Sequence, residues 1–315
     1  MSTPRPMDYR VRHITTYTYA TPVTISHHAS RLLPRGFDTQ SVHHASVAIQ
    51  PRPAHRCERE DFFGNRLTTF TLNESYRALT VTAASRVAVR PPALPDPERT
   101  PPWEEVAVRL ASGIGAEIVE NCQYTFDSPL VRASAELYAF AAPSFPPGRP
   151  VLAGAVDLCR RIHTEFAYDP AATTIATPMT QVLRERRGVC QDFAHVMIGA
   201  LRALGLAARY VSGYVLTRMP GDGARLEGGD ASHAWVSVFV PVAGVSNGGW
   251  IDIDPTNDKL VTHEHVVIAW GRDFEDVSPV KGVMLGGGHG LPEVSVDVTP
   301  LTSNGSVMTA PPAGP

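Results

Sequence analysis

Residues 188–215 read GVCQDFAHVMIGALRALGLAARYVSGYV and place a cysteine, a helix-forming segment and a strand-forming segment in direct succession. The apolar residues after Cys190 recur at helical spacing, as Phe193, Met197 and Leu201 do, and Gly205 is a natural C-terminal stop. From residue 206 onward, β-branched and aromatic residues favour a strand. The segment therefore predicts a helix that begins with a cysteine and leads directly into a sheet.

Two later runs of strand-forming residues are expected to extend this sheet. They read HAWVSVFVPV at 233–242 and GWIDIDPT at 249–256, and the glycine-rich segments 219–232 and 243–249 precede them. An antiparallel sheet packed on the cysteine-led helix is the simplest arrangement of these elements. The expected fold class is α+β.

The rest of the chain divides into regions of different periodicity. Residues 1–90 contain short alternating runs typical of a β-rich N-terminal domain, and the proline-rich residues 91–103 are typical of a linker. Residues 104–300 are assigned to the core, and residues 301–315 are expected to be a disordered tail. Within the core, the spacing predicts helices near 104–119, 130–142 and 150–166, a short helix that Gly188 ends, and a last strand at 293–301.

Composition and charge argue against several classes of protein. Hydrophobic residues make up 43% of the chain and charged residues 19%, which suffices for a core without metals or disulfides. The net charge is -3, without clusters of lysine or arginine, so no nucleic-acid or membrane partner is expected. No apolar run approaches the ~20 residues of a membrane span, and the first residues lack a secretory pattern. Four well-separated cysteines favour a reducing, cytoplasmic setting.

Cys190 is the candidate nucleophile. A thiol attacks an acyl carbon as thiolate, and an ordinary cysteine is mostly protonated at neutral pH. The predicted helix N-terminus supplies unpaired backbone N–H groups and a positive dipole end, which stabilise a thiolate and can bind the oxyanion of a tetrahedral intermediate. Cys57, Cys122 and Cys159 lack such a position, and we interpret them as structural or incidental.

His233 and Asp254 are the candidate base and the candidate orienting carboxylate. His233 begins a predicted strand after small residues, and Trp235 is placed to shield it from water. A neighbouring carboxylate would fix the tautomer of the imidazole. Asp252 and Asp254 point to the same face of one strand, so alternation alone does not choose between them. The position of Asp254 at the strand end, beside Pro255, favours Asp254.

Other motifs do not have the context that their chemistry needs. The Gly-x-Ser-x-Gly match at 244–248 lies between two predicted strands, whereas a serine nucleophile elbow lies between a strand and a helix. The histidines at 27–28, 43–44 and 263–265 lack the spacing of a helical metal site, so their clustering is interpreted as chance and no metal is expected. The glycine-rich segment 286–290 has no following helix to bind phosphate.

Several segments taken together resemble the transglutaminase-like superfamily, specifically its bacterial members with an N-terminal β domain. The core segments are 188–215, DASHAWVSVFVP at 230–241 and GWIDIDPTND at 249–258; HITTYTYATPV at 13–23 and DFFGNRLTTFTL at 61–72 are similar to the companion domain. The resemblance covers most of residues 9–300. It implies a papain-like core in which Cys190, His233 and Asp254 act in that chain order, and the sequence does not depart from the pattern at these three.

The resemblance implies acyl transfer on an amide through a thioester, with no cofactor. We expect hydrolysis of a peptide or isopeptide bond in a peptide or protein substrate, because a free enzyme meets water more often than a bound amine. Amine transfer to protein glutamine and a non-catalytic, peptide-binding scaffold are the alternatives. Oligomeric state and the role of the N-terminal domain are left open by the sequence.

Overall fold

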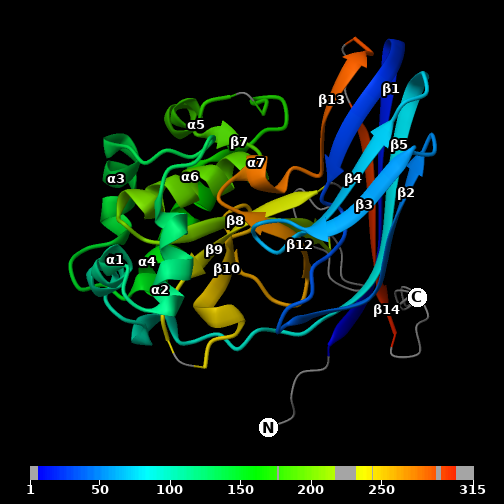
Figure 1. Cartoon of the computed structure of the whole chain (residues 1–315). Coiled ribbons are helices and arrows are strands. Elements are labelled where there is room, and N and C mark those ends of the chain that lie inside the picture. The colour runs from blue at the N-terminus through cyan, green and yellow to red at the C-terminus, as the bar shows by residue number, and fades with distance from the viewer. Residues whose placement is uncertain (1–5, 176, 217–231, 243, 289–291, 303–315) are drawn as a thin grey trace, which may run out of the picture.

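A computed structural model of the 315-residue chain gives the fold (Figure 1). The structure describes residues 6–175, 177–216, 232–242, 244–288 and 292–302. The tail expected to be disordered lies outside the described residues from 303 onward, and so does most of the glycine-rich segment 219–232.

The N-terminal sheet is built around one very long strand. β1 (Met7–Ser30) pairs with β5 (Tyr76–Val89) along most of its first half and with β4 (Arg66–Leu72) in its second half. β2 (Gln40–Gln50) lies beyond β5, and β3 (His55–Glu60) lies beyond β4. The expectation of a β-rich N-terminal region is confirmed.

Two strands from the end of the described chain join this N-terminal sheet. β13 (Val280–Gly286) pairs with the second half of β1, and β14 (Glu293–Leu301) pairs with its first half. Figure 1 shows both beside β1, away from the helices. The strand pairing therefore departs from the boundary that assigned all of 104–300 to the core. The reason is the length of β1, which leaves an open edge along each half for a distant segment to pair with.

A second sheet of five antiparallel strands lies among the helices. Its order is β11-β10-β9-β8-β12, and α6 (Cys190–Ala203) packs against β8 and β9. The strands are β8 (Ala208–Val215), β9 (His233–Phe239), β10 (Trp250–Asp254), β11 (Lys259–Leu260) and β12 (His265–Gly271). The short parallel pair β6 (Ala167–Tyr168) and β7 (Arg187–Gly188) precedes α6. The α+β class is confirmed.

The helices of the core follow the predicted pattern, with two differences. The helices are α1 (Trp103–Ser112), α2 (Ala116–Cys122), α3 (Ala135–Ala141), α4 (Val151–Glu165), α5 (Met179–Glu185) and α7 (Phe274–Val277). The helix expected over 104–119 is split, because Gly113 adopts a left-handed φ of 60° and ends α1. The short helix ends before Gly188, because Arg186 takes a left-handed φ of 54° and its N–H bonds to the Val182 carbonyl. Within the described residues, no helix combines the length and apolarity that crossing a bilayer requires.

Two buried histidines make this fold sensitive to acid. His13 of β1 lies 2.8 Å from the Tyr214 hydroxyl of β8 and 2.8 Å from the Thr15 hydroxyl. His195 of α6 accepts a hydrogen bond from the Phe274 N–H at 3.2 Å. Burial lowers the pKa of each histidine to about 4. The folded protein therefore keeps both neutral at pH values where the unfolded chain protonates them.

We expect the melting temperature to fall between pH 7 and pH 5. The unfolded chain binds more protons in this range, so stability rises with pH, and each histidine costs about 2 kcal/mol at pH 5. Together they lower the melting temperature by on the order of 10 °C, measurable by differential scanning calorimetry. His13→Gln should show a smaller difference between the two pH values. Equal melting temperatures at pH 5 and pH 7 for the wild type would contradict this expectation.

Candidate active site

Three elements of the core bring Cys190, His233 and Asp254 together. Cys190 is the first residue of α6, His233 is the first of β9, and Asp254 is the last of β10. β9 and β10 are hydrogen-bonded neighbours, and α6 packs on β9. The three side chains belong to residues that are 8%, 1% and 0% exposed. The residues that the sequence singled out thus share one buried site.

The histidine bonds to Asp254 rather than to Asp252. The distance between His233 Nε2 and Asp254 Oδ2 is 2.8 Å. Asp252 Oδ2 instead accepts a hydrogen bond from the indole Nε1 of Trp235 at 3.0 Å. Trp235 is fully buried, and its ring centroid lies 6.1 Å from that of His233. The indole therefore covers the histidine while the second aspartate anchors the indole.

The Asp254 carboxylate accepts several further hydrogen bonds. Its Oδ1 accepts the backbone N–H groups of Thr256 at 2.9 Å and Asn257 at 3.2 Å. Its Oδ2 also accepts from Asn257 Nδ2 at 2.7 Å and lies 3.1 Å from His265 Nε2. Burial by itself would raise the pKa of Asp254, but the two histidines outweigh it and hold this pKa well below its usual range. The carboxylate is therefore ionised and acts only as an acceptor.

An ionised Asp254 fixes the tautomer of His233. Because the carboxylate only accepts, Nε2 of His233 carries the hydrogen of their contact, and Nδ1 is the atom left to exchange a proton. Nδ1 is buried and has no hydrogen-bond partner among the residues that the structure describes. Burial lowers the pKa of His233, but the Asp254 carboxylate and the neighbouring Cys190 raise it to about 10. This environment favours the imidazolium form of His233.

The N-terminus of α6 gives Cys190 free backbone donors. The first N–H groups of a helix have no partner within it, and those of Cys190 and Gln191 donate to no acceptor within the part of the chain that the structure describes. Asp192 stabilises the turn before the cysteine, because its Oδ2 accepts hydrogen bonds from the Val189 N–H at 2.9 Å and from the Thr173 hydroxyl at 2.6 Å. Donors placed in this way suit the binding of an oxyanion.

Gly188 is needed because Asp192 fills the space where its side chain would lie. A Cβ at Gly188 would stand 2.5 Å from Asp192 Oδ2. We expect Gly188→Ala to displace Asp192, to cost about 1–3 kcal/mol of stability, and to slow alkylation of Cys190 by iodoacetamide. Calorimetry and peptide mass spectrometry would measure the two effects. Gly36→Ala is the control, because its nearest neighbour would be a backbone oxygen at 3.9 Å. Equal behaviour of the two variants would refute the role given to Gly188.

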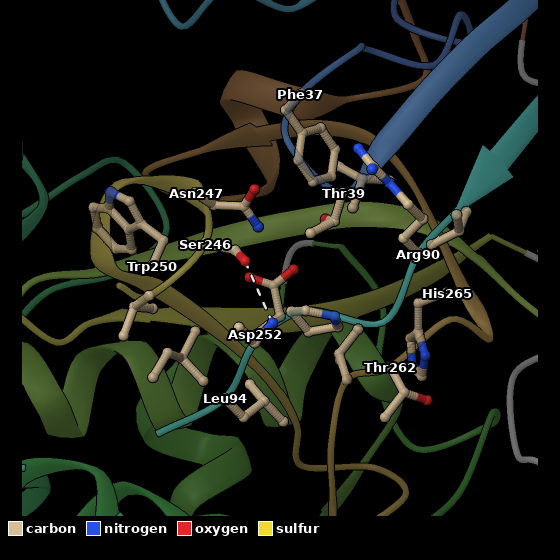
Figure 2. Close-up of a pocket in the computed structure, with 17 residues that line it drawn as sticks. Phe37, Thr39, Arg90, Leu94, Ser246, Asn247, Trp250, Asp252, Thr262 and His265 are labelled. Carbon is tan, nitrogen blue, oxygen red and sulfur yellow. Dashed lines mark hydrogen bonds between the residues drawn. The ribbon is translucent and has the colours of Figure 1, made fainter. Parts of the chain in front are cut away.

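A groove of about 400 Å³ adjoins the site. Gln191 and Asp192, next in sequence to the cysteine, form part of its wall, together with Leu130, Ile175 and Met179. A second pocket, shown in Figure 2, lies between the linker and β10 and encloses only about 30 Å³. Binding sites for small molecules usually enclose about 300–1,000 Å³, so the groove has the size of a substrate site and the second pocket does not.

Within the described residues, the side chains that could together hold a metal ion are those of His233, Asp254 and His265. Their ligand atoms lie within 4.8 Å of one another. However, histidines that bind metals normally donate the hydrogen on their second nitrogen to an acceptor. In the described part of the chain, the Nδ1 atoms of His233 and His265 have no hydrogen-bond partner. The short distances to Asp254 instead fit hydrogen bonds between imidazoles and a carboxylate.

Sequence reasoning missed two residues of this site, Asn257 and His265. Asn257 follows Asp254 by three positions in a turn, a spacing at which an amide often bonds back to a carboxylate. His265 belongs to the histidine pair at 263–265, whose clustering the sequence analysis interprets as chance. The serine motif at 244–248 stays outside the site: Ser246 Oγ accepts from the Ala93 N–H at 3.3 Å, and the chain continues through a short 3₁₀ turn into β10.

Comparison with known proteins identifies both parts of the chain. Residues 9–88 match the model of the bacterial transglutaminase-like N-terminal region, and residues 139–255 match that of the transglutaminase-like superfamily core. An uncharacterised protein of Mycobacterium tuberculosis is 40% identical over 297 residues, which is 93% of each chain. A protein-glutamine gamma-glutamyltransferase of Pseudomonas aeruginosa is 32% identical over 99 residues, 29% of this chain and 14% of that protein. The fold is similar to the crystal structure of a proposed cysteine protease from Cytophaga hutchinsonii, with a TM-score of 0.73 and 20% sequence identity. The superposition covers 96% of this chain and 93% of the Cytophaga chain.

Proposed function

This chain belongs to the transglutaminase-like superfamily, and from that premise we propose that it is a cysteine enzyme that cleaves amide bonds by acyl transfer. Cys190 is the nucleophile, His233 is the general base and acid, and Asp254 orients the histidine. One observation carries the proposal: His233 is bonded to Asp254 through Nε2, which leaves its unpartnered Nδ1 to serve Cys190.

In the proposed reaction, these groups act in sequence. The Cys190 thiolate attacks the amide carbonyl, and the oxyanion that forms accepts hydrogen bonds from the N–H groups at the start of α6. The His233 imidazolium gives its Nδ1 proton to the departing amine, and the C–N bond breaks to leave a thioester. Water then attacks the thioester while Nδ1 takes its proton, and the thiolate leaves as the carboxylic acid product forms.

The substrate we propose is a peptide or an isopeptide in a protein, bound along the groove beside Gln191. The groove joins apolar side chains with amide and hydroxyl groups, which suits an extended chain. No cofactor enters the reaction. We also propose a reducing, cytoplasmic setting, which the four free thiols support.

Amine transfer is the second candidate, and the partial match to the Pseudomonas aeruginosa enzyme favours it. A peptide containing glutamine, incubated with methylamine and analysed by mass spectrometry, separates the two reactions. Hydrolysis yields glutamate or a cut peptide, whereas transfer yields the methylamide. Cys190→Ala should form none of these products. If the products appear equally with Cys190→Ala, or if neither appears across a peptide library with the wild type, the proposed function fails.

A further inference from the structure

His265 lies against the carboxylate on which the proposed mechanism depends. It is the first residue of β12 and is 1% exposed. Its Nε2 lies 3.1 Å from Asp254 Oδ2, the same oxygen that lies 2.8 Å from His233 Nε2. The ring meets Trp235 edge to face, with centroids 5.0 Å apart. Two histidines from different strands thus share one carboxylate oxygen.

Apart from His233, which is the histidine that Asp254 orients, the other donors to Asp254 differ from His265 in being local. Thr256 and Asn257 belong to the turn that follows Asp254, so they move with it. His265 reaches the carboxylate from β12, which lies at the opposite edge of the five-stranded sheet from β11. A donor on a separate strand constrains the carboxylate relative to the whole sheet, which local donors do not do.

β12 is in turn held by side chains of the N-terminal sheet. Gln40 Nε2 donates to the Val267 carbonyl at 2.7 Å, and Gln40 Oε1 accepts from the Val267 N–H at 2.8 Å. Asn65 makes the same pair of bonds to Trp270, at 2.8 Å and 2.9 Å. The Tyr9 hydroxyl donates to the His263 carbonyl at 2.9 Å. Both amides are buried and pair with the free edge of β12 as a neighbouring strand would.

Resting on the proposed function, we infer that His265 is a positioning residue, which orients Asp254 toward His233 and which the N-terminal sheet keeps in place through β12. The N-terminal domain thereby supports the catalytic centre through its contacts with β12. Figure 2 shows where His265 lies, at the small pocket between the linker and β10.

Burial lowers the pKa of His265 and leaves the ring neutral near pH 7. Asp254 of β10, His233 of β9 and Lys259 of β11 are the charged or titratable groups that act on it. Arg90, which directly precedes the linker, and Asp252 line the same small pocket. The Asp254 carboxylate opposes this lowering of the pKa. A neutral His265 donates its Nε2 hydrogen to Asp254 and leaves the positive charge of the pair on His233.

The test is the pH profile of Cys190 alkylation by iodoacetamide in the full-length protein. We expect His265→Phe to slow the alkylation of Cys190 at pH 6 about 10-fold, which is the effect of losing a hydrogen bond to a charged group. The acidic limb of the pH profile should also move to higher pH. His265→Gln retains an N–H donor at a similar reach and should restore most of the rate. His263→Phe, two residues away on a half-buried side chain, is the matched control and should leave the profile unchanged.

Gln40→Ala tests the link to the N-terminal sheet and also serves if His265→Phe does not fold. It should slow alkylation at pH 6 in the otherwise wild-type protein and in the His265→Gln background, which keeps the contact. It should have no further effect in the His265→Phe background, because there both substitutions act on one contact. A folded His265→Phe or Gln40→Ala with the wild-type profile would overturn the inference while the proposed function stands. If wild-type Cys190 itself shows no reactivity that depends on His233, the proposed function fails instead.

Discussion

His233→Gln is expected to remove the selective reactivity of Cys190 below neutral pH. The thiolate is the form that alkylates, and a thiol without a basic or cationic partner is about 0.3% ionised at pH 6. An imidazolium next to a thiol stabilises the thiolate, and a glutamine side chain cannot supply that charge. A rate loss of roughly 10-fold at pH 6 should result, measured by peptide mass spectrometry after brief treatment with iodoacetamide.

Two other cysteines of the same chain serve as internal controls for this experiment. Cys57 is exposed and reports the rate of a thiol outside the site, while Cys159 is buried, with a pKa that burial raises, and should stay unreactive. His55→Gln, on the exposed strand β3, is the matched control and should behave as wild type. An unchanged rate at Cys190 in His233→Gln would exclude His233 as the base.

Asp254→Asn should have a larger effect on turnover. The amide can present Nδ2 to His233 Nε2, which then accepts a hydrogen bond, so that Nδ1 carries the hydrogen and no longer takes the thiol proton. Without the carboxylate, burial is left to lower the pKa of His233. The loss of the correct tautomer costs on the order of 10⁴-fold in the well-studied serine triad. We expect a loss of about 10²–10⁴-fold in acylation by p-nitrophenyl acetate.

Asp252→Asn is the control for this substitution. It lies two residues away on the same strand and bonds to the Trp235 indole rather than to a histidine. Its amide oxygen can still accept from the indole, so acylation should change little. Equal losses in the two variants would mean that the effect of Asp254→Asn comes from general damage to β10 and not from the histidine.

The helix that begins at Cys190 and the strands after it were predictable because their signals are local. Apolar spacing marks α6, and β-branched runs mark β8, β9 and β10. The resemblance to the transglutaminase-like superfamily then implied that Cys190, His233 and Asp254 form one site, and the structure brings those three residues together. Their catalytic role stays a prediction until the experiments above are made.

The parts that the sequence did not predict depend on contacts between distant segments. The β12 run HVVIAWG is apolar without alternation, because it is buried in the core. The contact between His265, at the start of β12, and Asp254 depends on how the strands are arranged in the folded sheet. β13 and β14 join the first sheet because β1 is long enough to pair twice along its edge. Neither contact leaves a pattern in the local sequence.

The proposed acyl transfer is tested most directly by asking whether an acyl group becomes attached to Cys190. The purified protein is treated with p-nitrophenyl acetate at pH 7, quenched in acid, and examined by intact and peptide mass spectrometry, with Cys190→Ala in parallel. We expect one acetyl group per chain, on Cys190, that hydroxylamine removes and that is absent from Cys190→Ala. Acetylation spread over lysines and other cysteines, with Cys190 unmodified, would contradict the claim that this chain is a cysteine acyl-transfer enzyme.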